Sequence, residues 1–310
     1  MNAPPHRRPF PSRLLGLLIL PLVLAASTGL PAPGTMRRTQ ADESPPGPKI
    51  VLIAGAKSHG PGHHEYEKGL ELLAHCLRTS PDTRTCRVEV HRNGWPQDER
   101  TLDDADSILL FSDGADHDEA AHPLLSGDRL DVLRRQMARG CGLVALHYTL
   151  FVPNRRGAEE FLDWLGGYFD YENGTDDPRG WYSAIGTHTA RFEPASDHPV
   201  CRGVAPIDLH EEYYYQMRFR PDDPRRTSIA RVHLPGREQP EVVAWAVERG
   251  DGGRGFAFTG GHFHSNWSVR EFRRLVLNAL VWTAGAEVPA NGVDSTLPAD
   301  FEARPRPDDG

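Results

Sequence analysis

The sequence predicts an α/β fold built on a mostly parallel sheet with helices on both faces. Four short apolar runs, rich in branched or aromatic residues and bounded by Gly, Ser or Asp, are typical of strands that are buried on both sides. Segments with helical periodicity lie between them, which favours a doubly wound arrangement. Each run also leads directly into a loop with histidine or acidic residues. The runs are 49–54, 107–111, 142–146 and 255–259.

The connecting segments carry the spacing of amphipathic helices. The segment 65–78 places Leu70, Leu73 and Leu77 on one stripe, and a strand over 86–91 follows it. Further helices are expected over 125–139 and 159–166. The last helix should begin at Ser268, because Glu271 three residues later completes a capping box, and it should stop at Gly285.

The pattern changes to strands in the second half of the chain, over 187–192, 211–219, 227–232 and 241–247. We interpret them as an added antiparallel or edge region of the same sheet. The length of 310 residues allows one elaborated domain or two, and we favour one domain over 49–289. Residues 290–310 are polar and Pro-rich, so we expect a surface tail there.

The N-terminus has the three-part layout of a secretory signal peptide. Arg7 and Arg8 precede an apolar run over 14–26, and small residues follow up to Ser27. The arginine pair also fits a twin-arginine export signal, although a general secretion signal explains it equally well. We therefore expect a signal peptide over 1–27, a flexible linker over 28–48 and a periplasmic or secreted protein without a stable membrane span after cleavage.

The net charge limits the classes of ligand to expect, and the cysteines raise the question of a disulfide. A net charge of -8 argues against nucleic acid, whose binding needs a cationic surface, and favours a neutral or cationic small molecule. In an oxidising compartment Cys76 and Cys86 could form a disulfide, but connectivity does not follow from sequence.

Polar side chains follow all four apolar runs. His59, Asp113, His147 and His262 lie in the loops that leave the predicted strands. Because ligands of open α/β sheets bind outside the carboxyl ends of the strands, these loops should converge on one polar pocket. A single loop histidine is usually a solvent-exposed one, but four such loops at one edge favour a functional site.

The first of these loops is rich in glycine and imidazole. It contains His59, His63, His64 and Glu65 and enters a helix, as phosphate-binding loops do. Its spacing matches neither a dinucleotide fingerprint nor a Walker loop, so we expect no nucleotide. Several imidazoles beside a carboxylate are better suited to a divalent metal, Zn²⁺ or Mn²⁺.

Two further histidines stand at strand ends. His147 is either a metal ligand or a general acid or base, the alternative being a buried ring that bonds backbone groups. His262 follows two glycines, which allow the backbone to approach a ligand. His264, two residues later, is the weaker candidate because it can point the other way.

Aromatic residues lie in or beside the same loops. Rings next to polar groups suit a carbohydrate, which has apolar C–H faces and a rim of hydroxyls. The alternative is that some of these rings belong to the core. The candidates are Tyr148, Tyr214, Phe263 and Trp267.

Four motifs together resemble the trehalose-utilisation ThuA-like family. They are SHGPGHHE at 58–65, GCGLVALHY at 140–148, EEYYYQMRF at 211–219 and TGGHFHSNW at 259–267. The resemblance covers roughly 49–289 and implies a flavodoxin-like, class I glutamine amidotransferase-like fold and a link to disaccharide catabolism through 3-keto-sugars. Consecutive strand residues face opposite sides, so only one of Glu211 and Glu212 can face the pocket. By resemblance we choose Glu212.

The chain departs from the amidotransferase relatives at one position. Those enzymes carry a nucleophilic cysteine on the turn after the strand that is here 142–146, whereas this chain has His147 there and Cys141 at the other end of the strand. Amide hydrolysis through a thioester is therefore not expected.

The hypothesis is an exported metal-assisted enzyme with isomerase, epimerase or lyase chemistry on a disaccharide or 3-keto-glycoside. Its catalytic residues would be His147, Glu212 and His262, with His59 as an additional metal ligand. The alternative is a non-catalytic carbohydrate-binding protein, and homo-oligomers are compatible with both. A two-carboxylate glycosidase fits less well, because no Asp/Glu pair stands out. The expected substrate contacts are His64, Asp113, Tyr148, Tyr214, His264 and Trp267.

Overall fold

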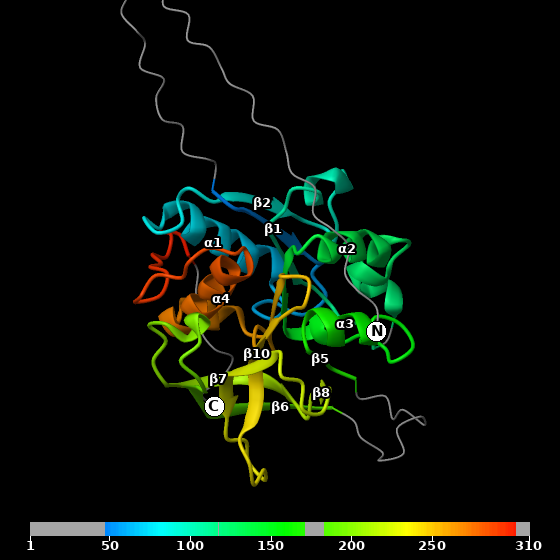
Figure 1. Ribbon diagram of the computed structural model, residues 1–310. Coiled ribbons are helices and arrows are strands. Elements are labelled where there is room, and N and C mark those ends of the chain that lie inside the picture. Colours follow the sequence, from blue (N-terminus) through cyan, green and yellow to red (C-terminus); the bar gives the residue numbers. More distant parts are fainter. Residues whose placement is uncertain (1–46, 117, 171–182, 302–310) are drawn as a thin grey trace, which may run out of the picture. The chain divides into compact units, whose positions relative to one another are not determined.

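The computed structural model describes residues 47–116, 118–170 and 183–301, and residues 44–310 form one compact unit. In the described part, one mixed sheet has the strand order β2-β1-β3-β4-β11-β10-β9-β6-β7 (Figure 1). The strands from β2 to β11 are parallel to one another, and those from β10 to β7 pair antiparallel. A separate two-stranded sheet joins β5 and β8.

The strands of the main sheet are β1 (Lys49–Ala54), β2 (Arg87–His91), β3 (Ser107–Phe111), β4 (Gly142–Leu146), β6 (Ala184–Pro194), β7 (Ile207–Tyr215), β9 (Arg226–Val232), β10 (Glu241–Glu248) and β11 (Arg254–Phe258). The small sheet has β5 (Gly167–Tyr168) and β8 (Arg218–Phe219). The helices are α1 (Tyr66–Thr79), α2 (Arg129–Ala138), α3 (Ala158–Trp164) and α4 (Arg270–Thr283), and short 3₁₀ turns cover Glu99–Leu102, Glu119–Ala121, Pro123–Leu125, His147–Leu150, Pro199–Cys201 and His264–Ser268.

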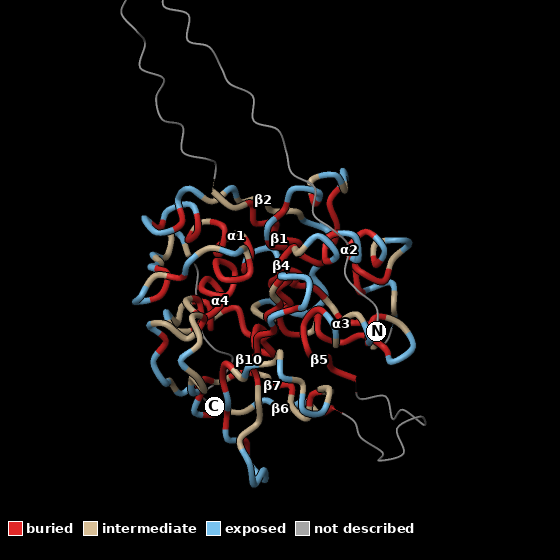
Figure 2. Tube along the Cα trace, viewed as in Figure 1, coloured by how far each residue is buried: buried red, intermediate tan, exposed pale blue. Residues whose placement is uncertain are grey.

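Helices cover both faces of the parallel strands, as the apolar runs predict. Ile50 and Leu52 of β1 pack with α1 and α4 in one apolar cluster, whereas Val51 and Ile53 pack with α2 and α3 in another. Alternate residues of a strand point to opposite faces, so a strand with apolar residues at every position must be covered twice. Figure 2 shows the resulting burial along β1 and β4.

The predicted fold class is confirmed, and the four strands of the second half of the chain do extend the same sheet in antiparallel fashion. The helix expected over 125–139 is shorter, since α2 begins only at Arg129. Gly127 has a φ of 58° in the left-handed region, and this breaks the segment into a 3₁₀ turn and the helix.

The predicted capping box at the start of α4 is wrong. The Ser268 hydroxyl donates to the Ser265 carbonyl at 2.6 Å, because it ends the preceding 3₁₀ turn, and Val269 takes the N-cap position. Glu271 instead accepts hydrogen bonds from Arg270. The stop is confirmed, since Gly285 follows the helix with a φ of 77°.

Part of the expected surface tail packs on the domain. Val293 is fully buried and its amide donates to the side-chain oxygen of Asn278 at 2.8 Å, while Leu297 and Phe301 lie against the core. Cys76 and Cys86 are free thiols, so the disulfide considered from the sequence is absent here. The signal peptide and nearly all of the linker fall outside the described residues. In the described part, no helix has the length and apolar character needed to cross a membrane.

Candidate functional site

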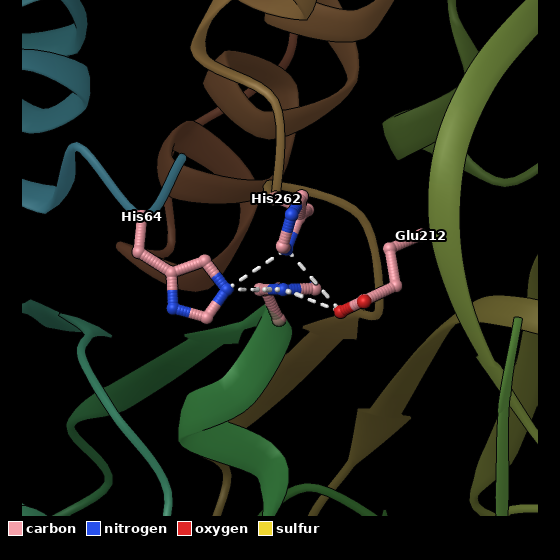
Figure 3. A group of neighbouring side chains, drawn as sticks. His64, Glu212 and His262 are labelled. Carbon is pink, nitrogen blue, oxygen red and sulfur yellow. Dashed lines mark hydrogen bonds and ion pairs between the residues drawn. The ribbon is translucent and has the colours of Figure 1, made fainter. Parts of the chain in front are cut away.

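Loops at the carboxyl ends of the parallel strands converge, as predicted, on one cluster of side chains. His64 comes from the loop between β1 and α1, His147 directly follows β4, and His262 follows β11. Glu212 reaches the same place from the antiparallel strand β7. Figure 3 shows the side chains of His64, Glu212 and His262 directed at one another. We refer to His64, His147, Glu212 and His262 as the quartet.

The ligand-type atoms of the quartet all lie within 4.8 Å of one another. His64 Nε2 is 3.1 Å from His147 Nε2 and 3.0 Å from His262 Nδ1. The Glu212 carboxylate is 3.2 Å from His262 Nδ1 and 3.5 Å from His147 Nε2. His64, His147 and His262 are buried, and Glu212 is partly exposed, so the cluster opens to solvent on the side of β7.

Two of the three histidines have unusual backbone conformations. His64 and His147 have φ values of 46° and 54°, in the left-handed region that non-glycine residues rarely occupy. Such a conformation costs on the order of 1–3 kcal/mol per residue, and it persists only where the surrounding structure enforces it. At both positions it turns the ring toward the quartet at the end of a strand or loop.

The tautomer of His147 follows from its hydrogen bond. Its Nδ1 lies 2.7 Å from the backbone carbonyl oxygen of Thr259, which can only accept, so Nδ1 carries the proton. Burial, together with the neighbouring His64 and His262, lowers the pKa of His147 well below its usual value. The ring is therefore neutral, with a lone pair on Nε2 directed into the quartet.

The same reasoning applies to His64. Its Nδ1 is 2.7 Å from the hydroxyl of Tyr66, and that hydroxyl donates to Asp113 Oδ1 at 2.5 Å. Because the hydroxyl proton is committed to Asp113, the phenol oxygen accepts from Nδ1–H. Burial lowers the pKa of His64 to about 4, so this ring too is neutral with a lone pair on Nε2.

Two lone pairs therefore face each other at 3.1 Å, between His64 Nε2 and His147 Nε2. Neither nitrogen has a proton for the other, so the direct contact between them is repulsive. His262 Nδ1, 3.0 Å from His64 Nε2, and the Tyr214 hydroxyl, 3.3 Å from His147 Nε2, can each donate to one of the nitrogens, and a cation between the two would satisfy both. Hydrogen-bond acceptors behind imidazole rings are the arrangement that orients histidines as metal ligands.

The spacing of the quartet fits a divalent metal. Metal–nitrogen and metal–oxygen bonds of about 2.0–2.2 Å at tetrahedral angles separate neighbouring ligand atoms by about 3.4 Å. Four of the six separations in the quartet are 3.0, 3.1, 3.2 and 3.5 Å, and all six lie within 4.8 Å. Three imidazole nitrogens and one carboxylate suit Zn²⁺ or Mn²⁺. The quartet could hold such an ion.

The two neighbouring glutamates have different roles. Glu212 faces the quartet, as chosen from the sequence; burial opposes its ionisation, but the hydrogen bond from His262 lowers its pKa. Glu211 faces the other way and is fully buried. Its carboxylate accepts from the backbone amides of Glu212, Gly261 and His262 at 2.8, 3.0 and 3.2 Å and from the side-chain amide of Asn266 at 3.0 Å. Glu211 thus connects the strand carrying Glu212 to the loop carrying His262.

Aromatic rings border the quartet. Tyr214 stacks on His147 with ring centroids 4.6 Å apart, and its hydroxyl is 3.3 Å from His147 Nε2. Tyr148 lies 5.7 Å from the ring of His64, and its hydroxyl bonds Asp116. Phe263 packs against His262 with centroids 4.7 Å apart. The expectation that Tyr148, Tyr214 and Phe263 lie at the site agrees with these positions.

Two predicted substrate contacts lie elsewhere. Trp267 is only 1% exposed and packs edge-on against Phe111 and Phe272, because its 3₁₀ turn directs the ring beneath α1 into the core. The ring of His264 lies against Phe301, with ring centroids 5.5 Å apart.

The positions of His59 and His64 differ from those that the predicted roles call for. His59, expected as a ligand, is exposed and lies outside the quartet, although its ring centroid is 3.6 Å from that of His64. His64, expected as a substrate contact, is the buried ligand candidate. Asp113 lies behind His64, 3.4 Å from Nδ1, where it orients the ring. Sequence reasoning missed Tyr66 and Glu211, which act through hydrogen bonds that no spacing reveals.

Cys141 lies at the opposite end of β4 from His147. Its thiol is 1% exposed, and burial raises its pKa to about 12. A nucleophilic cysteine needs an accessible thiolate, so Cys141 is a core residue.

The fold and the cluster define an α/β protein with a three-histidine, one-carboxylate site at the carboxyl edge of its parallel strands. The chain belongs to the ThuA family, described as trehalose utilisation, whose model matches residues 50–283. No curated protein shows significant similarity to the chain.

Two solved ThuA-like structures of low sequence identity share the fold, and a third structure superposes less well. A ThuA-like protein from Bacteroides uniformis superposes with a TM-score of 0.54 at 12% identity, over 79% of this chain and 94% of that one. A ThuA-like protein from Parabacteroides merdae gives 0.52 at 17% identity, over 82% and 94%. A glutamine amidotransferase from Thermotoga maritima gives 0.41 at 11% identity, over 77% and 99%. Membership of the family suggests a role related to trehalose utilisation.

Proposed function

We propose that this protein is a divalent-metal enzyme that acts on a disaccharide or its 3-keto derivative, with isomerase, epimerase or lyase chemistry. The observation that carries the proposal is the pair of lone pairs on His64 Nε2 and His147 Nε2, 3.1 Å apart. A cation between them removes their repulsion, and Glu212 adds the negative charge that such an ion favours.

A bound divalent ion would supply Lewis acidity toward a sugar carbonyl or hydroxyl. The chain's own residues would orient the substrate and move its protons. Tyr148, which is partly exposed, offers apolar ring surface beside a hydroxyl group, a combination that suits a sugar. Tyr214 is 1% exposed and supports the ring of His147 from behind. The family description supports the sugar class, and the inert Cys141 argues against thioester chemistry.

Metal analysis of the purified protein tests the first part of the proposal. We expect one equivalent of Zn²⁺ or Mn²⁺ to bind, and the His147→Ala variant to lose it. His264→Ala is the matched control, because this buried histidine lies in the neighbouring loop but faces Phe301. A protein that binds no divalent metal, or a His147→Ala variant that binds it as well as the wild type, would show the proposal to be wrong.

Incubation with glucosides and 3-keto-glucosides, with and without added metal, tests the second part. A product of different mass indicates a lyase, and an unchanged mass with a new NMR spectrum indicates an isomerase or epimerase. The alternative is a non-catalytic carbohydrate-binding protein. It predicts sugar binding without turnover, unaffected by chelator and by His147→Ala.

Export is a separate proposal and rests on the N-terminal sequence alone. Mass spectrometry of the protein from a periplasmic or medium fraction should find a mature chain that begins at Thr28, after cleavage behind Ser27. Substitution of Arg7 and Arg8 by lysine should block export only if the twin-arginine route is used. Intact Met1 in the cytoplasmic fraction would contradict export.

A further inference from the structure

Asp113 connects the quartet to an exposed histidine. It follows β3, and its Oδ1 accepts from the hydroxyls of Tyr66 at 2.5 Å and Ser58 at 2.6 Å. Its side chain is 17% exposed. A single carboxyl oxygen that accepts from two hydroxyls is the pattern of an ionised carboxyl group. Asp113 is therefore a carboxylate, which accepts hydrogen bonds and donates none.

The carboxylate determines which way Ser58 donates. A hydroxyl has one proton, and that of Ser58 is directed at Asp113, the stronger acceptor. The Ser58 oxygen also lies 2.7 Å from Nδ1 of His59. Since the serine proton is committed, Nδ1 of His59 must donate to the serine oxygen. In this tautomer the lone pair of the His59 ring lies on Nε2.

The position of His59 places that lone pair at the entrance to the quartet. The ring is exposed, and its centroid lies 3.6 Å from that of His64 and 6.1 Å from that of His262. The lone pairs of His64 and His147 point inward, whereas His59 is outside the quartet. His59 is thus an imidazole at the entrance whose accepting nitrogen is unprotonated and accessible.

We infer that His59 is the general base of this site and that Asp113, through Ser58, is the positioning residue that fixes its tautomer. The inference rests on the proposed function. Nε2 of His59 takes a proton from a hydroxyl or carbon of the bound sugar, and the electron pair of the broken bond stays on the sugar. The imidazolium keeps its Nδ1 proton, which remains hydrogen-bonded to the Ser58 oxygen. It returns the Nε2 proton to the product.

One carboxylate oxygen thereby sets two histidines for two tasks. Through Tyr66 it turns the lone pair of His64 inward, as a ligand requires, and through Ser58 it turns that of His59 outward. The group His59, His64 and Asp113 also has the spacing of a metal site. Asp113 Oδ1 and His59 Nδ1 already have hydrogen-bond partners, so we assign the group to proton transfer.

The test is nitrogen NMR of the histidine side chains in the full-length, ¹⁵N-labelled, Zn²⁺-loaded protein at pH 7.5. Long-range ¹H–¹⁵N spectra distinguish protonated from unprotonated ring nitrogens, and the His59→Gln variant identifies the signals of His59. We expect the Nδ1–H tautomer of His59 in the wild type and in Ser58→Thr, which keeps the hydroxyl. We expect Ser58→Ala and Asp113→Asn to lose this preference.

A His59 ring with its proton on Nε2, or one whose tautomer is the same in Ser58→Ala, would overturn the inference. So would binding of two Zn²⁺ equivalents of which His59→Gln loses one. Because this measurement needs no substrate, it tests the tautomer that the inference requires whether or not a sugar is turned over.

Turnover gives a second readout where one of the sugars reacts. His59→Gln should keep its metal and lose about 10²–10⁴-fold in kcat, the usual contribution of a general base. Unchanged kcat in His59→Gln contradicts the inference and leaves the metal proposal intact. If the wild-type protein binds no metal but His59 has the expected tautomer, the metal proposal is contradicted and the inference on His59 is not.

Discussion

His64 Nε2 and His147 Nε2 lie 3.1 Å apart, and the hydrogen bond behind each ring leaves both nitrogens with a lone pair directed at the other. A cation between the two nitrogens would replace the repulsion between their lone pairs by an attraction of both lone pairs to the cation. The backbone conformations of both residues and the hydrogen bonds to Tyr66 and Thr259 hold this geometry.

Metal should therefore stabilise the fold. Zn²⁺ at 1,000 times its Kd stabilises a protein by about 4 kcal/mol, because it binds the folded state. Differential scanning fluorimetry should show a higher Tm with Zn²⁺ and a lower one with chelator. His147→Ala should abolish the response, and His264→Ala should retain it. An equal Zn²⁺ response in both variants would show that the ion binds outside the quartet.

Substitution of Glu211 should weaken metal binding, although Glu211 is not itself one of the proposed ligands. All four hydrogen bonds of Glu211 are accepted ones, so the amide of Glu211→Gln would face N–H donors. Loss of an orienting group of this kind typically costs about 10–100-fold in metal affinity. Competition titration with a chromophoric chelator measures the change, and Glu248→Gln on the exposed end of β10 is the control. Wild-type affinity in Glu211→Gln would exclude the positioning role.

The metal-free protein should lose stability as the pH falls from 6.5 toward 4. Burial lowers the pKa of His64, His122 and His198 to about 4 and that of His147 well below its usual value, so the unfolded chain binds protons that the folded protein does not. Glu211 opposes this trend, because burial raises its pKa to about 7 and the folded state keeps its proton. The four histidines together favour proton binding by the unfolded chain more than Glu211 favours proton binding by the folded protein, so the free energy of unfolding falls as the pH falls.

Urea unfolding at several pH values in the presence of chelator checks this dependence. His64→Gln should show a shallower fall in the free energy of unfolding, since one of the suppressed protonation sites is gone. A free energy of unfolding that stays constant between pH 6.5 and 5 would contradict the burial of neutral histidines.

Trp267 and Tyr148 should respond in opposite ways to substitution. Trp267→Ala removes a fully packed core ring and should lower the free energy of unfolding by about 3–5 kcal/mol, with metal binding retained by the folded protein. Tyr148→Ala, at the partly exposed border of the site, should weaken sugar binding at a smaller cost in stability. Denaturant unfolding and calorimetric titration with the sugars measure the two effects. Impaired sugar binding by a folded Trp267→Ala variant would show that this ring contacts the substrate.

Much of the fold could be predicted from local pattern. The apolar runs specify β1, β3, β4 and β11, because a strand covered on both faces needs apolar residues at every position. The same pattern predicts that the loops after these strands meet at one edge. Their polar residues are therefore a readable signal, and they led to His147 and His262.

The choice of side chains within that edge was decided by the tertiary structure. In the glycine-rich loop, the sequence does not distinguish His59 from His64; a φ of 46° and the hydroxyl of Tyr66 turn His64 inward. Strand alternation shows that only one of Glu211 and Glu212 faces the site. The backbone amide of Gly261, which donates a hydrogen bond to Glu211, belongs to a loop fifty residues away. Periodicity reports burial, whereas ring direction depends on contacts between segments that are distant in the chain.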